Sequence, residues 1–135
     1  MSTAVETHPE HTAPGAAAKW AGRVISALPV ALLLFSASMK ILASPQFVEA
    51  SKKFAYPDGV LQRIGFLEVA CALVYVFPKT AVLGAILLTG YFGGAIATHV
   101  RIGEPFVLPL VLGILVWVGL YLREPRLRAL APQRT

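Results

Sequence analysis

The sequence TAVLGAILLTGYFGGAIATHV, residues 80–100, runs for twenty-one residues without Asp, Glu, Lys or Arg. A helix needs roughly 17–25 mainly apolar residues to cross the hydrocarbon core of a bilayer. This stretch therefore predicts a membrane-spanning helix. Its many small residues raise a second question, which is whether it packs against other helices or contributes to a ligand site.

The composition of the whole chain agrees with a membrane protein. Of the 135 residues, 56% are hydrophobic and 14% are charged, whereas soluble domains carry about 25% charged residues. The mean hydropathy is +0.68. The net charge of +5 comes from basic residues that flank apolar runs and do not gather on one polar face. This pattern favours the lipid bilayer as partner and argues against nucleic acid.

Three more apolar runs have a length that suits a membrane span. The four predicted spans are residues 24–42, 60–77, 80–100 and 106–122. The connections at 78–80 and 101–105 are short, so the helices that they join must be antiparallel neighbours. In the longer link, SPQFVEASKKFAYPDG (44–59), apolar residues recur at helical spacing, which predicts a short amphipathic helix on the membrane surface.

The predicted fold is thus an all-α integral membrane protein, a four-transmembrane-helix bundle with one surface helix between the first two spans. We expect a disordered N-terminal tail at 1–19, a transmembrane domain at 20–123 and a basic tail at 124–135. The first span has no signal-peptide cleavage pattern, and we expect it to be retained. The basic tail has two readings, either solvated charge beside the membrane or a specific site for anionic lipid.

Basic residues set the predicted orientation. Four spans put both termini on one side of the membrane, and seven Lys and Arg residues lie on that side against five on the other. Because cytoplasmic loops carry the excess of positive charge, this count predicts that both termini are cytoplasmic.

Glu68 lies inside the second predicted span, eight residues after Val60. At a rise of about 1.5 Å per residue this is about 12 Å inside the span. A charged carboxylate is costly at that depth, so Glu68 must face the bundle interior. Its carboxyl group either forms a structural hydrogen bond to another helix or takes part in ligand binding or proton transfer. Lys40 ends the first span and either reaches back to the interface or forms an ion pair with Glu68.

His99 and Arg101 end the third predicted span on the same membrane side as Lys40. On a helix with 3.6 residues per turn the two side chains project about 200° apart, so a pocket would recruit one more readily than both. The candidate intramembrane polar pocket comprises Lys40, Glu68, His99 and Arg101. We expect no metal site, because no pair of ligands at metal spacing lies within the spans.

Most of the stretch with which we began reads as a packing surface. The predicted packing residues are Ala85, Thr89, Gly93 and Ala97, which recur every four residues, and beside them Gly90 and Gly94, which are also four residues apart. Small side chains let helices approach closely in lipid. We also expect the Thr hydroxyls to bond back to the preceding turn.

The chain resembles the DoxX-like family of small four-span bacterial membrane proteins. The likeness is carried by SASMKILASPQFVE, GFLEVACALVYVFPKTAVLGAILLTGYFGGAIATHVR and VWVGLYLREPRLRAL, which together span residues 36–130. Lys40, Glu68 and His99 match polar positions of such proteins. The resemblance implies a four-helix bundle in the bacterial inner membrane, and more loosely a connection to quinone as cofactor.

Three functions remain open at this point. No catalytic motif is found, so the first is a non-catalytic partner, or a quinone-binding component, of a membrane redox system. The second is a small solute or proton-coupled transporter, in which Glu68 titrates. The third is a membrane assembly or scaffold protein, in which Glu68 is purely structural. Besides the lipid bilayer, the expected partner is a membrane redox complex or a second copy of the chain in a homo-oligomer.

Overall fold

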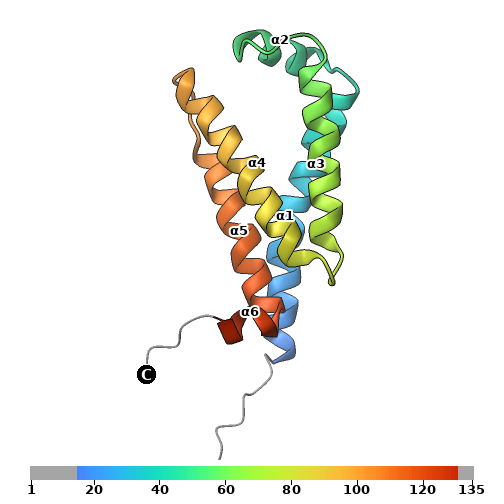
Figure 1. Ribbon diagram of the computed structural model, residues 1–135, viewed down its shortest axis with the longest axis vertical. Helices are drawn as coiled ribbons and strands as arrows, with labels where there is room; N and C mark the ends of the chain where they lie inside the picture. The colour runs from blue at the N-terminus through green and yellow to red at the C-terminus, as the bar shows by residue number, and fades with distance from the viewer. Residues whose placement is uncertain (1–14, 131–135) are drawn as a thin grey trace, which may run out of the picture.

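The computed structural model describes residues 15–130, which form α-helices and connections without any strand (Figure 1). The helices are α1 (Ala16–Ile41), α2 (Pro45–Lys53), α3 (Val60–Val76), α4 (Ala81–Arg101), α5 (Val107–Arg123) and α6 (Pro125–Leu130). The expected all-α fold is confirmed, and α2 occupies the link in which the surface helix was predicted.

The four long helices form a closed arrangement. Helix α1 packs against α3 and α5, and α4 packs against the same two neighbours. Apolar side chains from all four helices meet in one core, which includes Leu33, Tyr75, Leu88 and Leu120. Figure 1 shows α2 at one end of this elongated molecule and α6 at the other.

Two of these helices have the length and composition of membrane spans. They are α1 and α4, with 26 and 21 residues, whereas the apolar α5 is shorter at 17. Only 22% of the most apolar part of α1 and 28% of that of α4 is buried. Their outward faces are thus apolar too, as contact with lipid requires and as soluble proteins avoid. Helix α3 also has 17 residues, and it contains the polar residues Gln62, Arg63 and Glu68.

The ends of the chain differ from the predicted boundaries. Helix α1 begins at Ala16, inside the segment 1–19 that was predicted to be disordered, and AAAK at its start has high helix propensity. The remainder of that prediction, residues 1–14, lies outside the described residues. In the basic tail, residues 125–130 form the short helix α6, which was not predicted from the sequence.

Close contact between helices occurs at glycines other than the predicted ones. A Cβ atom on Gly22 of α1 would lie 2.8 Å from the carbonyl oxygen of Gly119 in α5. One on Gly65 of α3 would lie 3.0 Å from Cβ of Lys40 in α1, and Gly84 of α4 touches the backbone of Tyr75 in α3. Because these three glycines have no side chain, the helices of each pair can approach closely.

The predicted packing residues of α4 divide into two groups. Ala85 is fully buried in the core. Gly90, Gly93 and Gly94 have open space where a side chain would stand, and Ala97 is exposed. The reason is rotational, since α4 turns its other face towards α3 and α5. Packing by these outward residues would therefore require a partner outside this chain.

Thr89 belongs to neither group. Its hydroxyl donates to the carbonyl of Ala85 at 2.7 Å, and that of Thr98 donates to Gly94 at 2.9 Å. The expected bonding to the preceding turn is confirmed. The Thr89 hydroxyl also accepts a bond from the Trp117 indole at 2.7 Å, which joins α4 to α5.

Candidate functional site

Lys40 is the centre of a buried polar cluster between α1, α3 and α4. Its ammonium nitrogen lies 2.7 Å from a carboxylate oxygen of Glu68, 2.9 Å from the Ser36 hydroxyl and 3.1 Å from the Tyr91 hydroxyl. Lysine has three N–H donors, so each of them has a partner inside the protein. We refer to Ser36, Lys40, Glu68 and Tyr91 as the Lys40 cluster.

The local structure explains how these side chains meet. Ser36 and Lys40 are four residues apart and lie on one face of α1. Gly65, one turn before Glu68, lets the backbone of α3 approach α1 next to Lys40. Both charged groups are thereby removed from the surface, with 8% of Lys40 and 2% of Glu68 exposed.

A hollow of about 180 Å³ lies beside Lys40, under α2 and the connection that follows it. Lys40 itself forms part of the wall, together with Phe47, Tyr56 and Gln62. The Lys40 ammonium lies 5.7 Å from the centre of the Phe47 ring, at cation–π distance. The buried ion pair is therefore adjacent to a space that is bounded by both apolar and polar side chains.

His99 and Arg101 lie in a separate group, where α4 meets the connection after α2. The His99 ring packs 5.4 Å from that of Phe54, and its Nδ1 donates to the Ala95 carbonyl at 2.7 Å. Arg101 donates to the Phe54 carbonyl at 2.7 Å. Next to them, the Tyr56 hydroxyl donates to Thr98 at 3.0 Å.

The four predicted pocket residues are thus found as two pairs. Lys40 and Glu68 form the ion pair considered from the sequence. Among the described residues, neither His99 nor Arg101 has a polar contact with that pair; both fasten the end of α4 to the connection between α2 and α3.

Tyr91 was not predicted to be a member of the cluster. A signal was present, because a buried Tyr hydroxyl usually has a hydrogen-bond partner and Tyr91 lies in the middle of a long apolar run. Its partner could not be named without knowing how α4 is rotated about its axis.

A second polar cluster surrounds Tyr75 towards the opposite end of the molecule. The Tyr75 hydroxyl donates to the Val116 carbonyl at 2.8 Å and accepts a bond from Ser26 at 2.9 Å. The Arg123 guanidinium lies 4.7 Å from the centre of the Tyr75 ring. This cluster ties α1, α3 and α5 together and contains no acidic group. Residues 15–130 hold no set of three His, Cys, Asp or Glu side chains that could bind a metal ion.

The apolar outward faces of the chain's long helices are those of a membrane protein. Residues 24–119 match the model of the DoxX-like family, and the chain belongs to this family. The match contains the whole Lys40 cluster, His99 and Arg101, and it excludes α6. No curated protein and no solved structure matches the chain.

Proposed function

We propose that this protein spans the bacterial inner membrane four times, with both termini in the cytoplasm, and binds the head group of a quinone beside the Lys40 cluster. In this role it is a non-catalytic, ligand-binding component of a membrane redox system. The four spans are α1, α3, α4 and α5, and α2 lies on the outer surface of the membrane.

The observation that carries the proposal is a buried charge pair at the wall of a hollow. An ion pair inside a protein offsets the loss of hydration only in part, and apolar residues of similar volume often stabilise a fold equally well. Ionisable residues inside membrane segments are functional more often than those elsewhere. Lys40 and Glu68 are both buried, and Lys40 borders a hollow of about 180 Å³.

The chemistry of the cluster suits a carbonyl ligand. Quinone oxygens accept hydrogen bonds, and the Lys40 ammonium and Tyr91 hydroxyl are donors. Tyr91 accepts from Lys40, so its own proton serves a further acceptor, either Glu68 or a ligand. The hollow is smaller than the roughly 300–1,000 Å³ of sites that enclose drug-sized molecules, so it suits a head group whose tail remains in lipid.

A structural role is the second candidate, and one observation favours it. All three donors of Lys40 are already satisfied by Ser36, Glu68 and Tyr91. In that case the cluster fixes the arrangement of α1, α3 and α4, and the protein serves as a membrane scaffold. A ligand would have to displace Ser36 or Tyr91 from Lys40, which a scaffold does not require.

A titration with quinones distinguishes the ligand-binding role from the scaffold role. Purified protein in detergent is titrated with a short-tailed ubiquinone and a short-tailed menaquinone by calorimetry. The test variant is Tyr91→Phe, and the matched control is Tyr75→Phe, which also removes one buried tyrosine hydroxyl but from the opposite cluster. Quinone binding is expected to weaken severalfold in Tyr91→Phe and in Glu68→Gln, and to persist in Tyr75→Phe and His99→Ala.

Two outcomes would reject the quinone site. The first is absence of binding by the wild-type protein. The second is binding that Tyr91→Phe and Glu68→Gln leave unchanged. A wild type without quinone affinity whose Tyr91→Phe variant unfolds more readily would favour the scaffold.

A further inference from the structure

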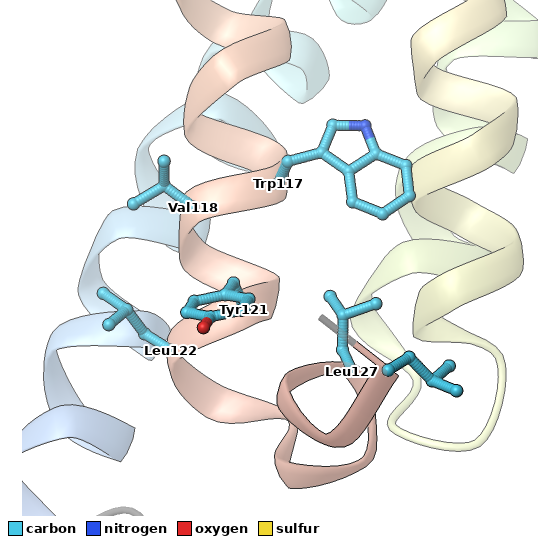
Figure 2. Close-up of a pocket in the computed structure, with 6 residues that line it drawn as sticks. Trp117, Val118, Tyr121, Leu122 and Leu127 are labelled. Carbon is cyan, nitrogen blue, oxygen red and sulfur yellow. The ribbon is translucent and has the colours of Figure 1, made fainter. Parts of the chain in front are cut away.

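A second hollow, larger than the one beside Lys40, lies far from the Lys40 cluster, between α5 and α6. It is a groove of about 440 Å³. Its lining is Trp117, Val118, Tyr121 and Leu122 from α5 together with Leu127 and Leu130 from α6. Figure 2 shows Trp117 at one end of the groove and the Leu127 side chain, from the turn of α6, at the other.

The groove has a fixed shape because both of its ends are hydrogen-bonded. At one end, the Trp117 indole donates to Thr89 on α4. At the other, Arg128 of α6 donates to the carbonyls of Tyr121 and Leu122 at 2.9 and 3.1 Å. These carbonyls end α5 and would otherwise lack partners within the helix. Arg128 therefore holds α6 against α5 and keeps the groove open.

The rim of the groove is cationic. The Arg128 guanidinium lies 5.5 Å from the centre of the Tyr121 ring, which is itself part of the lining. A guanidinium has five N–H donors, and the two bonds to α5 leave three for an anion. Arg126, one residue before Leu127, is exposed, and its guanidinium has no bond to any described residue.

The composition of this site specifies its ligand. An apolar groove takes a hydrocarbon chain, and arginines at its rim take a phosphate, bidentately where the geometry allows. One molecule that carries both parts is an anionic phospholipid. We propose that the groove between α5 and α6 binds one acyl chain of an anionic phospholipid, with its phosphate on Arg126 and Arg128.

This site is independent of the proposed quinone site. It lies at the opposite end of the molecule, and α6 is outside the family match. If both termini are cytoplasmic, the groove faces the cytoplasmic leaflet, whose surface is negatively charged and attracts basic segments next to the last span.

The test is native mass spectrometry of the full chain with phosphatidylglycerol or phosphatidylcholine of identical acyl chains. The wild type is expected to retain one phosphatidylglycerol in preference to phosphatidylcholine. Arg126→Gln, which breaks no bond within the described residues, is expected to weaken that preference about fivefold, the effect of one basic residue at an anionic surface. Val118→Trp, which fills the groove, is expected to reduce retention of both lipids.

The matched control is Lys19→Gln, which also removes one exposed positive charge at this end of the molecule, but from α1 and outside the groove lining. It is expected to keep the preference of the wild type. Equal retention of the two lipids by the wild type would overturn the proposal. A control that loses as much preference as Arg126→Gln, or a groove that retains lipid after Val118→Trp, would do so as well. A lipid-free dimer that Val118→Trp disrupts would assign the groove to a second copy of the chain.

Discussion

At the scale of single residues, Lys40 and Glu68 determine the polar interior of this protein. Two opposite charges at 2.7 Å attract strongly where water is excluded, but each has lost its hydration. Ser36 and Tyr91 lower that cost because they satisfy the remaining donors of Lys40. The pair is therefore stable as a unit and unstable when either partner is missing.

A double-mutant cycle measures this dependence. Lys40→Met and Glu68→Leu each leave one buried charge without its partner, and each is expected to lower the free energy of unfolding by about 3–5 kcal/mol. The double variant replaces both charges by apolar side chains and is expected to recover most of that loss. SDS titration in mixed micelles, followed by circular dichroism, gives the four values.

Small losses of stability in both single variants would contradict this prediction. Losses below about 1 kcal/mol in both single variants, the size typical of exposed ion pairs, would mean that water reaches Lys40 through the neighbouring hollow.

The ion pair could be considered from the sequence because charges inside apolar runs stand out. Glu68 had to find a partner, and Lys40 lay within reach on the same side of the membrane. Tyr91 could not be assigned, nor could His99 and Arg101 be separated from the pair. Both questions depend on the rotation and tilt of α4, which packing against α3 and α5 determines.

At the scale of helices, contact between α1 and α5 depends on two facing glycines, Gly22 and Gly119, and not on the glycine-rich stretch of α4. Gly22 stands against the backbone of Gly119 and Arg123, whereas Gly94 faces open space. In sequence, the repeated small residues of α4 are far more conspicuous than Gly22. A small residue permits close approach, but the position of the partner helix decides whether the approach occurs.

Two Gly→Ala substitutions test this distinction. In Gly22→Ala the new Cβ would lie 2.8 Å from a backbone oxygen of α5. The helices must separate, at an expected cost of about 1–3 kcal/mol. Gly94→Ala adds the same methyl group in open space and is expected to raise stability by about 0.5–1 kcal/mol through helix propensity. Thermal unfolding in dodecyl maltoside, followed by circular dichroism, compares the two variants.

The sign of the Gly94→Ala effect carries further information. If this variant is destabilised as strongly as Gly22→Ala, the outward face of α4 packs against another molecule, and the loss should then depend on protein concentration. A homo-oligomer would account for the small residues that the chain's own helices leave uncovered.

Helix α6 shows why short elements are hard to predict. A six-residue helix is unstable by propensity alone. Here Arg128 fastens it to the last carbonyls of α5, and Leu127 packs against the core. The basic tail was recognised from the sequence, but these contacts between neighbouring helices were not.

At the scale of the whole molecule, different contacts join the helices at the two ends. At one end, bonds from Tyr56 to Thr98 and from Arg101 to Phe54 join the connection after α2 to α4, and Lys53 forms an ion pair with Glu104. At the other end, Tyr75 and its partners join α1, α3 and α5. Helix α3 has only 17 residues and contains Gln62, Arg63 and Glu68, so it decides whether the chain crosses the membrane four times.

The proposed topology makes a direct prediction about α3. If α3 crosses the membrane, the connections at its two ends lie on opposite sides. In a Cys71→Ala background, Asp58→Cys is expected to react with a membrane-impermeant maleimide in intact spheroplasts. Ser2→Cys and Lys79→Cys are expected to react only after the membrane is permeabilised. The two positions that flank α3 are both exposed in the structure, so access from water depends on the membrane alone.

The labelling pattern separates three arrangements. Equal labelling of Asp58→Cys and Lys79→Cys in intact spheroplasts would mean that α3 does not cross the membrane. Opposite labelling with the sides exchanged would preserve the four spans and reverse the orientation, against the excess of basic residues on the side of the termini. The wild-type chain supplies the control, because its single cysteine, Cys71, is buried in the core and should react only after denaturation in SDS. Reaction of Cys71 in the folded protein would instead show that α3 separates from α4, which would expose the Lys40 cluster together with it.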